Sequence, residues 1–399
     1  MFDYLKFTIG TFLFGGVCAT LYMGGHWLWL GFPGVIIAWL LLDPLVEESR
    51  QPEYQHVWAI SLIAQGTLVV MIFSVFTLAW ISSPGDLLGM GALIQSSTGF
   101  DAIAAREAST WFDLVGAALA LGLIFGNIGF LGAHEFAHQT GNPTVLFSGR
   151  WMLALTAGYS FEVGHNWHHA HVGDRTDDPA SSRRGDSLYY WLGHNMFRQV
   201  SKAWQTEGER LKRRGKPFVS LDNQILRPSL RIAVVVAALY GVGGWYTLAF
   251  FAVACAVCKL MVEALTYYSH YGMIRVPGQR VEPRHAWNAN AALGNWLMFN
   301  IGRHSNHHHD GTIPFWDLKP GLPGEAPVNY PYFAGGLMAF IPPLFHKLMS
   351  PRLLKWDEEF ASAEEREIAH EQNASSGVAA LMAAAEGRQD SARAPLPAE

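Results

Sequence analysis

Four clusters of histidine are prominent in this sequence because their spacing suits metal ions. Two lie in the stretches HEFAH and HNWHH, and two more lie in YYSHYG and RHSNHH. Spacings of i, i+3 and i+4 put side chains on one face of a helix, and neutral imidazole is the commonest metal ligand among side chains. All four clusters adjoin apolar segments. The candidate metal ligands are His134, His138, His165, His168, His169, His270, His304, His307 and His308.

Nine imidazoles exceed the needs of one ion, since structural zinc takes four ligands and catalytic zinc takes three. Two ions that share nine histidines have four or five each, which leaves room for dioxygen or water. Imidazole suits Fe, Zn, Cu and Ni alike, so the ligands alone leave the metal open. The apolar surroundings suggest an apolar substrate, and attack on an unactivated C–H bond needs redox chemistry that zinc does not supply. This favours iron, with copper as the less favoured alternative.

Imidazole ligands need hydrogen-bond acceptors that orient them, and several acidic residues are near enough in sequence to do this. Glu162 precedes His165 by three residues and Glu263 precedes His270 by seven, so each can share a helix face with a ligand. The alternative for each carboxylate is an ordinary solvated surface charge. The candidates are Glu135, Glu162, Asp177, Asp178, Glu263 and Asp310.

The composition indicates a membrane protein. Of the 399 residues, 50% are hydrophobic and only 15% are charged, whereas about 25% are charged in soluble domains. The net charge of −5 comes without a basic stripe, which argues against nucleic acid as a partner. The three cysteines cannot form a disulfide framework. Cys255 and Cys258 have CxxC spacing inside an apolar run, and the second CxxC of a rubredoxin-like carrier is absent.

Six stretches are apolar enough for membrane spans, which need about 20 mostly apolar residues. They are residues 7–23, 27–42, 57–81 and 111–133, and two short spans that share residues 232–268 with a break near Gly243 and Gly244. Trp39 in the second span is a candidate for the wall of a substrate channel. The apolar stretch 151–161 is expected to be a re-entrant or interfacial helix. Residues 372–399 are expected to be a disordered tail, which leaves residues 1–371 as one transmembrane domain.

The distribution of basic residues predicts the orientation in the membrane. The segment between spans four and five is rich in Arg and Lys, whereas residues 82–110 contain Arg106 alone, so the positive-inside rule places the large segment in the cytoplasm. With six spans, both termini are then cytoplasmic, and all four histidine clusters fall on one side of the bilayer. The expected fold is therefore an all-α integral membrane protein of about six transmembrane helices with a cytoplasmic, histidine-rich helical cap.

The order HxxxH, HxxHH, HxxHH resembles the membrane fatty acid desaturase and hydroxylase superfamily, and within it the chain resembles the alkane 1-monooxygenase family. Beyond the histidine boxes, the stretches DDPASSRRGDSLYYW and PPLFHKLMSPRLLKW are similar to that family, as is the single-histidine box YYSHYG. The likeness covers roughly residues 110–357. One departure is the interval of two residues between His165 and His168, which is that of desaturases and leaves the substrate open.

This resemblance implies a membrane enzyme, in a bacterial inner membrane, with a non-haem di-iron centre held by the nine histidines. It would activate O2, with electrons from rubredoxin or ferredoxin and an NAD(P)H reductase, and hydroxylate the terminal methyl of an alkane or other aliphatic chain taken from the membrane. A fatty acyl desaturase with the same centre is the alternative. A metal transporter or storage protein is disfavoured, because the spans hold few ionisable residues.

Overall fold

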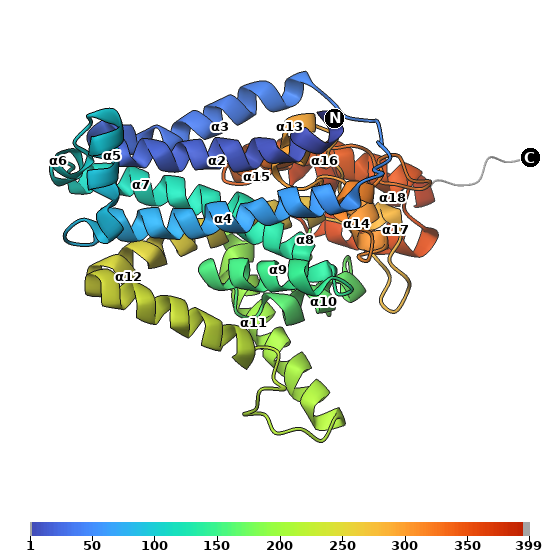
Figure 1. Cartoon of the computed structure of the whole chain (residues 1–399). Coiled ribbons are helices and arrows are strands. Elements are labelled where there is room, and N and C mark those ends of the chain that lie inside the picture. The colour runs from blue at the N-terminus through green and yellow to red at the C-terminus, as the bar shows by residue number, and fades with distance from the viewer. Residues whose placement is uncertain (1, 394–399) are drawn as a thin grey trace, which may run out of the picture.

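The computed structural model describes residues 2–393, and within that range the regular secondary structure is helical, joined by loops, with two isolated bridges, Glu47 with Ala291 and Asn288 with Val328. Long helices run roughly side by side and form a bundle (Figure 1). The helices of the bundle are α2 (Ile9–Thr20), α3 (Gly31–Leu42), α4 (Val57–Ser82), α7 (Trp111–Ile124), α8 (Gly132–His138) and α12 (Leu226–His270). Together with the apolar composition, this arrangement makes the chain an all-α integral membrane protein.

Within residues 2–393, four helical segments are long and apolar enough to cross a membrane. They are Phe2–Met23, Val57–Ser82, Trp111–His138 and Leu226–His270, and Gly31–Leu45 is a shorter apolar helix. The predicted break in the last segment is present: Gly243 and Gly244 leave helical geometry, and Gly244 has a φ of 62°. A Cβ at Gly243 would lie 2.0 Å from the Thr247 hydroxyl, so the close approach there requires glycine. The total of six spans stays a prediction.

The central element is the continuous helix Trp111–His138, which carries the first two histidines at its end. It begins after Thr110 because Thr110 and Asp113 form a reciprocal capping box, in which Asp113 accepts a 2.8 Å hydrogen bond from the Thr110 amide. Between α7 and α8 the residues Phe125–Leu131 form a π-helical turn. Such a turn shifts the angular register of everything after it, and π turns occur frequently at functional sites. This one sets the direction in which α8 points its histidines.

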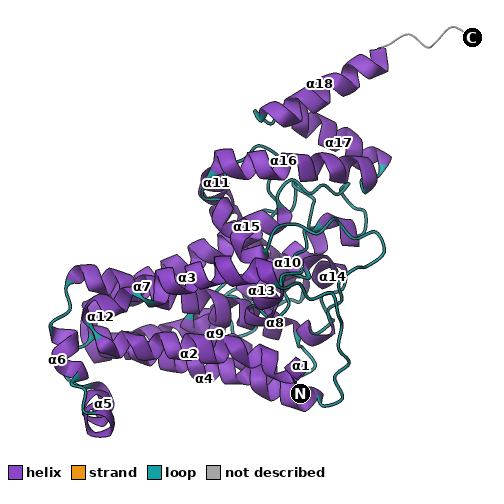
Figure 2. Ribbon diagram, turned by 90° about the horizontal axis from the view of Figure 1, so that it is seen from above, coloured by secondary structure: helices purple, strands orange, loops and turns teal. Residues whose placement is uncertain are grey.

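The remaining helices lie at the two ends of the bundle. One end carries the small helices α5 (Met90–Thr98) and α6 (Ala102–Glu107). The other end is a helical cap, to which the red C-terminal helices on the right of Figure 1, and at the upper right of Figure 2, belong. The cap helices are α9 (Pro143–Leu155), α10 (Phe161–His171), α11 (Leu188–Arg213), α13 (Ala292–Leu297), α14 (His304–His309), α15 (Tyr332–Met338), α16 (Pro342–Glu359), α17 (Ala363–Ala374) and α18 (Ala379–Arg393). Short helical turns account for α1 (Phe2–Leu5), Lys6–Thr8, Leu21–Met23, Gly25–Trp29, Asp43–Leu45, Leu87–Gly89, Pro283–His285 and Phe315–Asp317.

Two predicted segments differ from the structure. The apolar helix expected over 151–161 is α9, which starts earlier, at Pro143 after the cap residue Asn142, and packs on α4, α8 and α12. The tail expected to be disordered from residue 372 continues helix α17 to Ala374 and then forms α18, which packs on α16 and α17 with Leu381 fully buried. Alanine-rich sequence has high helix propensity, and the apolar contacts of α18 stabilise it. Residues 394–399 of the expected tail lie outside the described residues.

Candidate metal centre

The four histidine clusters meet at the cap end of the bundle. His134 and His138 come from α8, His165, His168 and His169 from α10, His270 from the last residue of α12, and His304, His307 and His308 from α14. Each helix supplies its ligands at i, i+3 or i+4, so helical periodicity turns them toward one point. All nine lie close together in two groups, although they are far apart in sequence.

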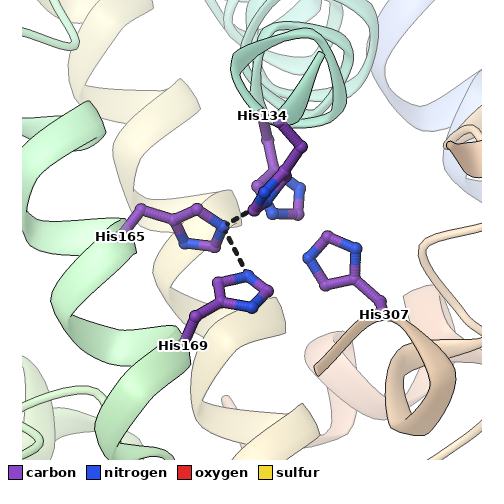
Figure 3. A group of neighbouring side chains, drawn as sticks. His134, His165, His169 and His307 are labelled. Atoms are coloured by element: carbon purple, nitrogen blue, oxygen red, sulfur yellow. Dashed lines mark hydrogen bonds between the residues drawn. The ribbon is translucent and has the colours of Figure 1, made fainter. Parts of the chain in front are cut away.

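The first group has five members: His134, His138, His165, His169 and His307. One ring nitrogen from each lies within 4.8 Å of those of all the others. The Nε2 of His165 is 2.9 Å from the Nε2 of His138 and 2.9 Å from that of His169. Figure 3 shows the labelled rings of His134, His165, His169 and His307 facing a common space from three different parts of the chain.

The second group contains His168, His270 and His308, again with nitrogens within 4.8 Å of one another. His304 joins it, because its Nε2 is 3.0 Å from that of His270 and 3.1 Å from that of His308. The Nε2 of His168 is 3.1 Å from that of His270. The neighbours His168 and His169 therefore serve different groups, as do His307 and His308, and the two groups share α10 and α14.

This donor set fits metal ions. Burial lowers the pKa of His165, His169, His307 and His308 far below the ordinary value for imidazole, and that of His304 to about 3, so these rings are neutral as ligation requires. Neutral rings that face one another through Nε2 cannot all donate a hydrogen bond. Several buried nitrogens have no hydrogen-bond partner among the described residues, including Nε2 of His134 and of His307. A cation between the rings would satisfy these lone pairs.

Two of the predicted carboxylates lie beside the imidazoles. Asp178 is fully buried, and its Oδ2 accepts hydrogen bonds from His168 Nδ1 at 2.8 Å and from the Ser181 hydroxyl at 2.7 Å. Glu135 is also buried, with its Oε1 3.5 Å from His134 Nδ1 and 3.4 Å from His307 Nδ1. Carboxylates that receive the distal N–H fix the orientation of the ring and present the other nitrogen to a metal.

The structure places the other predicted residues elsewhere. Glu162 accepts a hydrogen bond from Arg150 at 2.8 Å, and Asp310 accepts one from the Thr312 hydroxyl at 2.6 Å; within the described residues neither forms a hydrogen bond with one of the nine histidines. Asp177 pairs with Lys202 at 3.1 Å. Trp39 is buried and stacks on Phe333 with ring centroids 4.1 Å apart, and it is absent from the wall of the cavity described next.

A cavity of about 450 Å³ opens beside both groups of histidines. Its wall includes His134, His168, His270 and His304 together with apolar and polar residues of α10, α11 and α12. Most of the wall is apolar, and its residues include Phe130, Phe161, Gln199, Cys255, Lys259, Val262, Glu263, Ile301 and Tyr332. Ligand sites in proteins are typically of this kind, apolar with a few polar groups.

Sequence reasoning missed most of this wall. Phe161 could have been predicted from the sequence, because it lies four residues before His165 and therefore on the same face of α10. In the structure the ring centroids of the two residues are 4.7 Å apart and the rings are stacked. The sequence also indicated Lys259 as a functional residue, since it is a charged residue inside an apolar stretch, four residues before Glu263. Gln199 and Tyr332 carry no such signal, because only tertiary packing brings α11 and α15 to the cavity.

Comparison with known proteins agrees with this geometry. The family model described as fatty acid desaturase matches residues 109–335, which include all nine histidines and more than half of the chain. An alkane 1-monooxygenase of Pseudomonas putida is 33% identical over 262 residues, 63% of this chain and 63% of that protein. An alkane 1-monooxygenase 1 of Alcanivorax borkumensis is 34% identical over 257 residues, 61% of each chain.

A further relative matches almost from end to end. The hydroxylase component of a xylene/toluene monooxygenase of Pseudomonas putida is 28% identical over 369 residues, 89% of this chain and 90% of that protein. The alignments to the two alkane 1-monooxygenases, by contrast, span less than two thirds of the length of those proteins. Because the family match takes in the central helix and every histidine cluster together, the chain belongs to the fatty acid desaturase family.

Proposed function

We propose that this protein is a membrane non-haem di-iron monooxygenase that hydroxylates an aliphatic chain at its terminal methyl with O2. The observation that carries the proposal is the meeting of nine imidazoles beside an apolar cavity, whose wall six of them line. The five-member group and the four-member group would each hold one iron ion. The names of the relatives, which are alkane and xylene/toluene monooxygenases, support hydroxylation.

Iron, when bound, supplies the redox chemistry that O2 activation and attack on a C–H bond require. The protein residues have separate tasks. Asp178 holds the Nδ1 proton of His168, and Glu135 lies where it can do the same for His134 and His307. Phe130, Phe161 and Val262 exclude water from the cavity and hold an apolar chain against the histidines.

The electrons would come from a separate carrier. Cys255 and Cys258, the one CxxC pair, lie within α12 and line the cavity, and the sequence contains three cysteines, fewer than the four that hold an iron–sulfur site. A rubredoxin or ferredoxin, reduced by an NAD(P)H reductase, is the proposed donor. The positive-inside rule supports an active site that faces the cytoplasm from a bacterial inner membrane.

The test is product analysis in cells that express the chain with a rubredoxin or ferredoxin system, fed alkanes and fatty acids under isotopically labelled O2. We expect a labelled alcohol, and an iron content of two per chain in the purified protein. An unsaturated product without label would make the protein a desaturase, which the spacing of His165 and His168 also permits. Iron-loaded protein that yields neither product across the panel would overturn the proposal.

A further inference from the structure

A polar cluster lies in the cavity wall, away from the histidines. The Glu263 carboxylate is 3% exposed, accepts a 3.0 Å hydrogen bond from the Gln199 amide, and pairs with the ammonium of Lys259. All three side chains line the same cavity as His270 and His304. Since a helix rises about 1.5 Å per residue, Glu263 lies about 10 Å from His270 along α12.

Helix stability does not account for this cluster. An i, i+4 pair stabilises a helix by about 0.3–0.5 kcal/mol, and Lys before Glu is the weaker order. Here the pair lies within a membrane-spanning segment, where charged residues are costly and mark functional sites by default. The chain contains a matched ordinary pair for comparison, Lys355 and Glu359 on α16, where both side chains are more than half exposed.

The cluster retains binding capacity. An ammonium offers three donors, and the hydrogen bond to Glu263 is the one that Lys259 makes within the described residues. Its side chain is 40% exposed, while that of Glu263 is almost fully covered. The positive and negative charges of the pair cancel, so the cluster offers no net attraction to a carboxylate or to an amine. An uncharged hydroxyl can accept from Lys259 and donate to an oxygen of the cluster.

We propose that the Lys259–Glu263–Gln199 cluster binds the hydroxyl end of an amphiphilic substrate, so that the preferred substrate is an aliphatic alcohol rather than a plain alkane. This rests on the proposed function for the reaction and adds its substrate class. The hydroxyl is anchored about 10 Å from the metal centre, and the far end of the chain reaches the histidines. Oxidation of such a substrate by O2 with two electrons and two protons inserts one oxygen atom at the far methyl, gives a diol and releases water.

Two measurements test the proposal separately from the proposed function. The first is photo-crosslinking of metal-free protein in nanodiscs with 1-alkanols that carry a diazirine beside the hydroxyl carbon or near the far end. We expect the first probe to label α12 and α11 near Lys259 and Gln199, and the second to label α10 or α14. Identical labelling by the two probes would overturn the anchored pose whether or not the protein is a hydroxylase.

The second measurement is selectivity. Purified enzyme with its electron donors receives an alkane and the 1-alkanol of equal length in competition, and the products are separated. We expect the wild type to favour the alcohol and to oxidise its far methyl. The double variant K259M/E263Q removes both charges together, so no lone charge remains, and we expect its preference for the alcohol to fall about 10- to 100-fold.

The control variant is K355M, which breaks the exposed pair on α16 and should leave the selectivity unchanged. A wild type that prefers the alkane, or a double variant that keeps the alcohol preference and regiochemistry, would overturn the proposal. Crosslinks at the expected positions combined with no oxidised product would instead count against the proposed function while the binding site stands.

Discussion

The Nδ1 of His168 lies 2.8 Å from the Oδ2 of Asp178. Asp178 belongs to the loop that follows α10, and this loop also forms hydrogen bonds of its own. Asp178 also accepts from the Ala180 amide at 2.9 Å and from the Ser181 hydroxyl. The carboxylate is therefore fixed before it meets the imidazole. It determines which nitrogen of His168 carries the proton and directs the Nε2 toward His270.

Replacing Asp178 by Asn should weaken metal binding at the four-member group. The amide is similar in size but lacks the charge that favours the Nδ1–H form of His168, and removal of such partners lowers metal affinity about 10- to 100-fold. Metal content after dialysis against a graded chelator measures the effect. The control is D177N, since Asp177 is half exposed and pairs with Lys202. Equal chelator resistance of D178N and wild type would contradict this role.

The adjacent residues His307, His308 and His309 should differ sharply in their importance. H307A removes a ligand from the five-member group and H308A removes one from the four-member group, whereas His309 is exposed and belongs to neither. We expect H307A and H308A each to lose at least one ion per chain and to lose turnover, while H309A keeps both. Elemental analysis of monodisperse protein gives the result, and full metal in H307A would remove it from the ligand set.

Acid should loosen the attachment of α17. Burial alone would raise the pKa of Glu365, but hydrogen bonds from His285 and Arg284 lower it to about 2. A depressed carboxyl pKa contributes stability above the unfolded value near 4.5, and this stability is lost as the pH falls toward 2. The contribution is about 3 kcal/mol. Thermal unfolding between pH 6 and 3 should show a smaller acid sensitivity in E365Q than in wild type, with E364Q as the control.

The membrane orientation can be tested with single cysteines. Ser97 on α5 is exposed, and Ser220 in the loop between α11 and α12 is partly exposed. A membrane-impermeant thiol reagent should label S97C in intact cells and S220C only after permeabilisation, because the basic residues around position 220 are retained in the cytoplasm. The reverse pattern of labelling would place the histidines on the outer side.

Much of the site followed from helix periodicity. HEFAH and RHSNHH each place ligands one turn apart, and the hydropathy pattern put all clusters on one face, so their convergence could be predicted. The hydrogen-bond and packing partners of individual side chains could not be predicted. Glu162 has the spacing of an orienting residue, yet Arg150 on α9 takes its carboxylate. Trp39 lies at a plausible depth, yet Phe333 from α15 covers it. Sequence proximity carries no information about such long-range contacts.

The fold class, an all-α membrane protein, could be predicted from the composition, whereas several individual helices could not. The break at Gly243 and Gly244 could be predicted because glycine there interrupts an apolar run. The π turn at Phe125–Leu131 could not, since its apolar, glycine-containing sequence is equally compatible with an α-helix. The helix α18 was also missed, because its stability depends on contacts with α16 and α17 rather than on its own pattern.

The buried guanidinium of Arg184 ties the metal centre to the last helices of the chain, so the centre is completed only after these helices are synthesised. It holds the loop that carries Asp178 by hydrogen bonds to Asp357 on α16, at 2.6 and 2.7 Å, and to Asn373 on α17, at 2.9 Å. Both partners leave the ribosome after all nine histidines. Until they arrive, the loop lacks its ties to α16 and α17 and is held by its own hydrogen bonds and by contacts with earlier parts of the chain, such as the 3.0 Å hydrogen bond from Arg184 to the Gly272 carbonyl. Metal loading should therefore follow synthesis of α17, which makes maturation of the centre a late, post-translational event.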